Sequence, residues 1–189
     1  LPEKAQNYPL PYQLYNQGIR RYGFHGTSHK QLMEQGSKKL KLDLKKSKII
    51  TLHLGAGCSI TAIKNGQPID TSMGFTPLEG LAMQTRAGDI DPGIILYLQK
   101  HKDHSLKKLT QLLNHQSGLL GMTGKYQDMR DILFLAGEKV EDKNYQPEGF
   151  DSCTKEDIRR AKLALEIFIY RAQKYIGAYT TILKGLDGL

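Results

Sequence analysis

Two short runs of β-branched and apolar residues, separated by glycines, constrain the fold of this chain more than any other feature. Lys48–Leu54 and Ser59–Ile63 have the composition of β-strands, and Gly55–Gly57 lies between them. Strands joined by such a turn expose backbone N–H groups at its tip, where a phosphate can bind if no side chain keeps it away. Asn65-Gly66 predicts a second tight turn. The alternative interpretation of the whole stretch is an ordinary meander with hydroxyl-rich edges.

Length and composition are those of a soluble protein of a reducing compartment. Its 189 residues suit one domain or one lobe of a larger protein, and 39% hydrophobic residues suffice for a core. Cys58 and Cys153 cannot build a disulfide framework. No apolar run approaches the roughly 20 residues of a membrane span, and no signal peptide is evident at the first residues. We therefore expect a cytoplasmic protein without a membrane partner.

The net charge of +8 raises the question of a nucleic-acid partner. Six lysines cluster between residues 38 and 48, without an arginine or an aromatic residue that could stack on bases. A basic patch for nucleic acid and a solvated lysine surface are both conceivable, and the composition favours the second. We expect no nucleic-acid binding, although a positive field also favours small anionic substrates.

His25 is the first candidate for chemistry. Arg20–Phe24 is expected to form a short strand, and Thr27 or Ser28 to cap a helix that runs to about residue 40. His25 would lie at the junction, where α/β folds place ligand sites. A metal pair with His29 is conceivable, but no third ligand or carboxylate accompanies it, so we predict no metal site here. His29 is better explained as a hydrogen-bonded structural histidine.

The rest of the sequence predicts mostly helices. Residues 1–19 are expected to be extended with one helical turn, and residues 137–153 to form a loop. The other expected elements are a helix over Pro92–Lys100 capped by Asp91, a helix capped by Ser105, a turn or short strand at Ser117–Gly121, a helix beginning within Tyr126–Asp131, and a long helix capped by Thr154.

Several segments together resemble the acetate kinase family, in the order in which that family has them, from Pro2 to Gly188. They are Pro9–Tyr12, Arg20–Lys30, His53–Ser59, Asp70–Leu81 and Asp89–Pro92. The resemblance implies the fold of the acetate and sugar kinase, Hsp70 and actin superfamily. The chain would be an incomplete α/β, ribonuclease-H-like lobe with a mixed sheet flanked by helices. Residues 1–189 would then form a single partial domain, most of the second, nucleotide-binding lobe, with the N-terminal lobe and a C-terminal segment absent.

The same resemblance implies an activity and a set of site residues. The activity is reversible transfer of the ATP γ-phosphoryl group to acetate or another short carboxylate, giving acetyl phosphate and ADP. The cofactor would be Mg²⁺, and the full-length protein would be a homodimer. The catalytic residues would be His25 and Arg86, both at the transferring phosphoryl group. Two groups of residues would bind the nucleotide. Near its phosphates these are His53, Gly55, Ala56 and Gly57, and near its nucleoside they are Asp128, Met129 and Arg130. Asp128 and Arg130 have a second interpretation, as a helix cap and a surface charge.

Three positions depart from the family pattern. Ala56 stands where Asn is frequent, Gln84 where Gly precedes Thr-Arg, and Met129 where Phe is usual. None of the three removes His25 or Arg86. An alternative function is a catalytically incomplete nucleotide-binding fragment that needs a partner chain, and we expect the chain alone to be inactive. The prediction of phosphoryl transfer requires His25 and Arg86 to converge beside the glycine turn.

Overall fold

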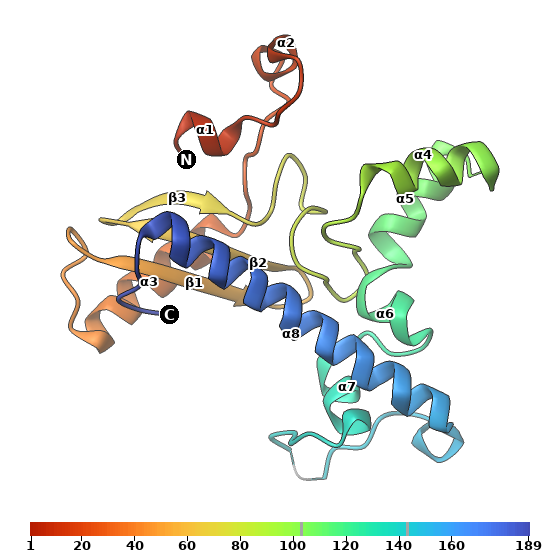
Figure 1. The fold of residues 1–189 in the computed structure, drawn as a ribbon. Helices are drawn as coiled ribbons and strands as arrows, with labels where there is room; N and C mark the ends of the chain where they lie inside the picture. The colour runs from red at the N-terminus through yellow and green to blue at the C-terminus, as the bar shows by residue number, and fades with distance from the viewer. Residues whose placement is uncertain (103, 143) are drawn as a thin grey trace. The chain divides into compact units, whose positions relative to one another are not determined.

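A computed structural model describes residues 1–102, 104–142 and 144–189. The chain divides into two compact units, one of Leu1–Leu81 with Ala172–Leu189 and one of Ala82–Arg171 (Figure 1). The longest helix, α8 (Lys155–Leu183), begins in the second unit and ends in the first. Among the residues described, no helix is both long enough and apolar enough to cross a membrane.

The first unit is built on a three-stranded antiparallel sheet in the order β1-β2-β3, with β1 at Lys48–Leu54, β2 at Cys58–Lys64 and β3 at Gln67–Thr71. Leu54 pairs with Cys58, which leaves a three-residue turn, and Asn65 and Gly66 have φ of 53° and 78° in the second turn. Both predicted turns are confirmed. The expected mixed sheet is antiparallel throughout its three strands, and a parallel contact occurs as an isolated bridge between Ile49 and Gly188.

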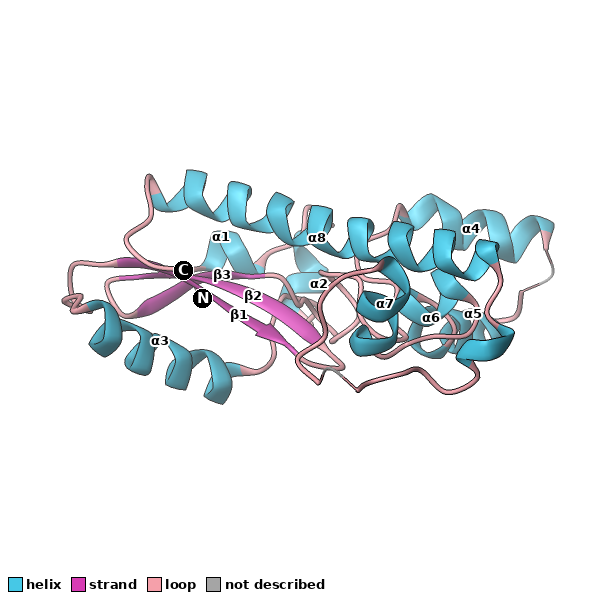
Figure 2. Cartoon of the chain, turned by 90° about the horizontal axis from the view of Figure 1, so that it is seen from below, coloured by secondary structure: helices cyan, strands magenta, loops and turns pink. Residues whose placement is uncertain are grey.

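Helices cover both faces of this sheet. Figure 2 shows α3 (Gly26–Leu40) on one side and the last turns of α8 on the other. Accordingly β2 is buried from Cys58 to Ile63 without the polar alternation of a half-exposed strand. Fully buried Ile50, Ile60, Met73 and Leu183 are part of the resulting core.

The N-terminal segment differs from the prediction in two respects. It forms two short helices, α1 (Glu3–Gln6) and α2 (Tyr12–Asn16), where one turn was expected. The strand predicted at Arg20–Phe24 is wrong. Backbone N–H groups of Tyr22 and Gly23 both donate to the carbonyl of Gly74, and the Arg21 guanidinium donates to carbonyls of residues 71–73. A side chain thus occupies acceptors that a pairing strand would need.

The second unit is helical. It contains α4 (Pro92–His101), α5 (Leu106–His115), α6 (Gly118–Thr123), α7 (Met129–Ala136), a 3₁₀ turn η1 (Phe150–Ser152) and the first part of α8. Asp91 and Ser105 accept from the first-turn N–H groups of α4 and α5, as predicted. Asp157 N–H donates to Thr154 Oγ1 and Thr154 N–H to Asp157 Oδ2, which confirms the cap of α8.

The prediction of a turn or strand at Ser117–Gly121 is wrong, because α6 begins there. Its first N–H groups donate to carbonyls of a distant loop, Leu119 to Met83 and Leu120 to Gln84, so tertiary contacts replace a local cap. The core of the unit joins α6, α7 and α8 through Leu119, Tyr126, Ile132, Leu135, Ala161 and Ala164.

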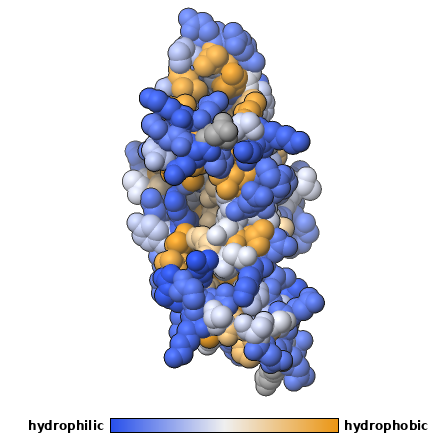
Figure 3. Space-filling view, turned by 90° about the vertical axis from the view of Figure 1, so that its right-hand side faces the viewer, coloured by the Kyte–Doolittle hydropathy of each residue, from blue (hydrophilic) through white to orange (hydrophobic). Residues whose placement is uncertain are grey.

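Residues 137–153 form the expected loop apart from η1, and residue 143 lies outside the described part. On α4 the side chains of Ile94, Leu96 and Tyr97 are exposed. Figure 3 shows hydrophobic residues in separate areas among hydrophilic ones.

Candidate functional site

The glycine turn between β1 and β2 is accessible. Gly55 and Ala56 are exposed and Gly57 is half-buried. A Cβ atom at Gly55 would lie 3.3 Å from His53 Nε2, so the His53 ring would have to shift slightly to accommodate a side chain there. The Cys58 thiol donates to the Gly55 carbonyl at 3.1 Å and holds the turn. An exposed backbone turn of this kind suits a phosphate group.

His25 and His53 meet beside this turn. His25 precedes α3 with φ 61° and ψ 25°, a left-handed conformation that histidine adopts more readily than most residues and that costs roughly 1–2 kcal/mol. Its ring stacks on that of His53, with centroids 4.0 Å apart and 18° between the planes. Its Nδ1 lies 2.8 Å from Ser59 Oγ, and His53 Nδ1 lies 2.9 Å from Ser28 Oγ. Two predicted site residues are therefore neighbours.

His29 lies under this pair and has the predicted structural role. It is buried, with Nδ1 2.8 Å from Thr51 Oγ1 and Nε2 2.7 Å from Ser59 Oγ. Burial, followed by the nearby His25 and His53, lowers the pKa of His29 to about 4. In the described ranges, no group of three or more His, Cys, Asp or Glu side chains is placed to hold a metal ion.

Sequence reasoning missed the hydroxyl residues of this cluster, Ser28, Thr51 and Ser59. A signal for two of them was present. Thr51 and His53 alternate along one strand and so lie on one face, and a three-residue turn sets Ser59 opposite His53 in the register.

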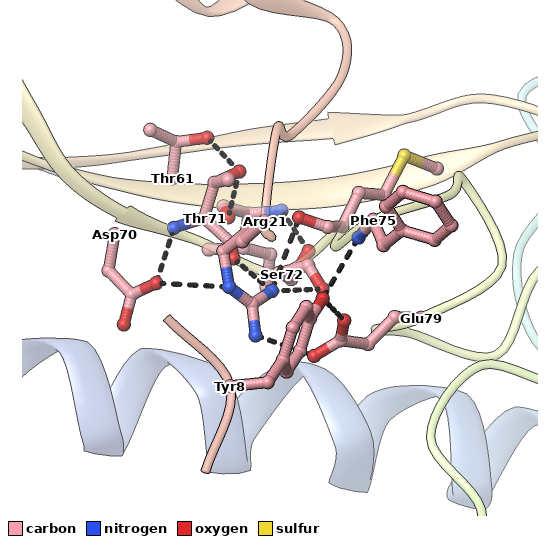
Figure 4. Close-up of polar contacts among 10 residues, drawn as sticks. Tyr8, Arg21, Thr61, Asp70, Thr71, Ser72, Phe75 and Glu79 are labelled. Atoms are coloured by element: carbon pink, nitrogen blue, oxygen red, sulfur yellow. Dashed lines mark hydrogen bonds and ion pairs between the residues drawn. The ribbon is translucent and has the colours of Figure 1, made fainter. Parts of the chain in front are cut away.

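The loop after β3 is anchored by a polar cluster around Arg21 (Figure 4). Besides the three backbone carbonyls, the guanidinium binds Glu79 Oε1 at 2.5 Å, and Tyr8 donates its hydroxyl to the same carboxylate. Burial and the Glu79 hydrogen bond raise the pKa of Tyr8 to about 12. Burial also raises the pKa of Asp70, which lies 4.0 Å from Arg21. A Cβ at Gly74 would overlap the Glu79 carboxylate and the Tyr8 hydroxyl, so a larger residue there would displace both groups from this cluster.

Arg86 lies in the second unit, on a half-buried loop that the backbone holds at several points. Met83 N–H donates to the Arg86 carbonyl at 3.1 Å, and Ser117 N–H donates to the Thr85 carbonyl at 3.0 Å. A Cβ at Gly118 would collide with the carbonyls of Met83 and Arg86. The loop is therefore held against the start of α6.

Asp128, Met129 and Arg130 form the start of α7, also in the second unit. Asp128 caps the helix by accepting from Arg130 N–H at 2.9 Å, and its carboxylate binds the guanidinium at 3.1 and 2.7 Å. The hydrogen bond from Arg130 lowers the pKa of Asp128. The interpretation of Asp128 as a cap is thus confirmed. Contact of these residues with a nucleoside stays a prediction, as does the convergence of His25 and Arg86, which belong to different units.

Comparison of sequences gives matches over the whole chain. The sequence model of the acetokinase family matches residues 1–189. The chain is similar to the acetate kinase of Chloroherpeton thalassium, with 50% identity over 190 residues, and to that of Clostridium kluyveri, with 45%. Each alignment covers 100% of this chain but only 42% and 43% of the relative. The chain thus spans about two fifths of the length of these curated relatives.

Solved structures agree with this similarity. Porphyromonas gingivalis acetate kinase superposes with a TM-score of 0.84 at 40% identity, over 98% of this chain and 42% of that one. A propionate kinase from Francisella tularensis gives a TM-score of 0.83 at 42% identity, over 99% of this chain and 44% of that one. The mixed helix and sheet arrangement described above matches part of these enzymes.

Proposed function

Because the chain belongs to the acetokinase family, we propose that it forms part of an acetate kinase, which transfers the γ-phosphoryl group of ATP reversibly to acetate. The observation that carries this proposal is the pair of stacked histidines, His25 and His53, beside an exposed glycine turn. Such a place offers both backbone N–H groups and imidazole donors to a phosphate, which is what positioning of a phosphoryl group requires.

In this proposal His25 and Arg86 stabilise the charge on the transferring phosphoryl group. The Nδ1 atom of His25 is used by Ser59, so the phosphoryl contact is assigned to Nε2. Arg86 supplies a forked guanidinium that matches two phosphoryl oxygens. His53 and Gly55–Gly57 would hold the nucleotide phosphates, with one donor fewer because residue 56 is alanine.

The nucleoside would lie against the beginning of α7, at Asp128, Met129 and Arg130. Mg²⁺ prefers oxygen ligands and reaches such sites largely through the phosphates of its nucleotide, so few protein ligands are needed.

The proposal also includes the ribonuclease-H-like lobe as a partial domain, the cytoplasm as location and a homodimer as the full-length form. We propose acetate rather than another short carboxylate as the acceptor, because most of the matched relatives are named as acetate kinases.

The second candidate is a nucleotide-binding fragment that catalyses nothing without a partner chain. It is favoured by the coverage of only 42% of the C. thalassium relative. The two candidates share the phosphate-binding turn and differ in whether the chain completes an active enzyme.

A chimera tests the proposed activity. The chain would replace the 190-residue segment that it matches in C. thalassium acetate kinase, and ADP formation from ATP and acetate would be followed with Mg²⁺ present. We expect turnover from the chimera and none from the chain alone. A folded chimera without turnover would contradict the proposal and favour the second candidate.

A matched pair of variants tests the role of His25 in this chimera. His25→Asn keeps a residue that tolerates the left-handed backbone but removes the imidazole, and should lower kcat by about 100-fold. His115→Asn, at the exposed end of α5, is the control and should leave kcat unchanged. Equal activity of the two variants would remove His25 from the proposed site.

A further inference from the structure

A continuous chain of hydrogen-bonding groups leads from β1 to His25. Thr51 Oγ1 lies 2.8 Å from His29 Nδ1, His29 Nε2 lies 2.7 Å from Ser59 Oγ, and Ser59 Oγ lies 2.8 Å from His25 Nδ1. Thr51, His29 and Ser59 are 6%, 4% and 0% exposed. Solvent therefore has little access to these three groups.

Two arrangements give every bond one proton and keep the Ser59 hydroxyl proton within the chain when His29 is neutral. A neutral imidazole has one N–H donor and one acceptor nitrogen, and a hydroxyl has one proton to donate. The lowered pKa of His29 keeps it neutral near pH 7. In one arrangement Thr51 donates to His29, His29 donates from Nε2 to Ser59, and Ser59 donates to His25 Nδ1. In the other, all three donations are reversed.

The two arrangements differ in what happens to the Thr51 hydroxyl proton. In the first it is donated to His29 Nδ1. In the reversed one it needs another acceptor, and within the described ranges Thr51 Oγ1 has a hydrogen bond only to His29. A buried hydroxyl proton without an acceptor is disfavoured, which in populations amounts to roughly five- to a hundredfold. The first arrangement should therefore dominate.

We propose that Thr51, through His29 and Ser59, keeps the proton of neutral His25 on Nε2. A neutral His25 then presents an N–H donor to a phosphoryl oxygen without having to be an imidazolium. Thr51, His29 and Ser59 are positioning residues in this scheme, because they act on the phosphoryl group only through His25. The use of the donor rests on the proposed function, whereas the tautomer itself does not.

Nuclear magnetic resonance tests the tautomer directly. The chain, labelled with ¹⁵N-histidine, would be studied by two-bond ¹H–¹⁵N correlation at about pH 8, above the ordinary histidine pKa. We expect the Nε2–H form for both His25 and His29. In Thr51→Val, His25 should become a mixture of tautomers, and Thr51→Ser should restore the single form. An Nδ1–H form in the wild type, or a His25 signal unchanged by Thr51→Val, would overturn the proposal.

Thr61→Val is the matched control. Thr61 is opposite Thr51 in the register and is 4% exposed, but its hydroxyl contacts Thr71 and not a histidine. It should leave the His25 tautomer unchanged, and a mixture in this variant would overturn the assignment to Thr51. If Thr51→Val does not fold, Ser59→Ala cuts the chain next to His25 and must produce the mixture instead.

Kinetics of the chimera separate this proposal from the proposed function. Thr51→Val should lower kcat by about twofold, because a near-equal mixture of tautomers leaves about half of His25 with its proton on Nε2, and Thr51→Ser should restore it. Unaltered kcat in Thr51→Val, together with an altered tautomer, would overturn the use of the donor. An inactive wild-type chimera with the expected tautomers would overturn the proposed function while supporting the hydrogen-bond chain.

Discussion

Replacing Arg21 by methionine should destabilise the first unit more than the loss of a surface arginine. The side chain is 16% exposed, and its guanidinium lies 2.9, 3.3 and 3.2 Å from the carbonyls of Thr71, Ser72 and Met73 and 2.5 Å from Glu79. Removing one partner of a buried ion pair costs about 3–5 kcal/mol. Glu79 is 31% exposed and keeps part of its hydration, so we expect the lower end, about 3 kcal/mol.

Urea unfolding followed by circular dichroism measures this loss. For a slope of about 2 kcal/mol per molar urea, the midpoint should fall by about 1.5 M. Arg20→Met is the matched control, because the described partners of Arg20 are Tyr15 and Tyr22, and a cation over such rings at an exposed site is worth about 0.5–1 kcal/mol. Equal midpoints for the two variants would refute the anchoring role of Arg21.

Three further predictions concern stability. Burial lowers the folded-state pKa of His29 to about 4, below its ordinary 6.5, so its contribution to folding stability is complete above pH 6.5 and is lost as the pH falls towards 4. Urea midpoints measured over that pH range should fall accordingly. Gly80→Ala should lower the melting temperature, since Gly80 has φ +113° and a Cβ would lie 2.8 Å from the Ser72 carbonyl. The control Gly36→Ala, inside α3 with open space around it, should instead stabilise the protein by about 0.5–1 kcal/mol. Thr154→Ala should cost about 1 kcal/mol and speed hydrogen exchange in the first turn of α8, and unchanged exchange there would contradict the cap.

The features that the sequence predicted correctly are those specified by neighbouring residues. The glycine turn, the Asn65-Gly66 turn and the caps at Asp91, Ser105 and Thr154 each depend on a few adjacent positions. Local chemistry is enough to determine a tight turn or the first turn of a helix.

The features that it missed depend on partners far along the chain. The predicted strand at Arg20–Phe24 fails because Arg21 binds carbonyls about fifty positions away, and α6 forms because the loop at Met83 accepts its first N–H groups. The cluster around His25 needed the register of β1 and β2 before Ser59 could be placed. Hydrophobic periodicity carries none of this information.

A double-mutant cycle on His25 and Arg86 tests the central proposal most directly. In the chimera, His25→Asn and Arg86→Gln would be made singly and together, and kcat/KM determined for each. Two residues that bind one phosphoryl group are coupled, so each single variant should lose about 100-fold and the double variant clearly less than the product of the two losses. Losses that multiply fully would contradict the convergence of His25 and Arg86 on that group.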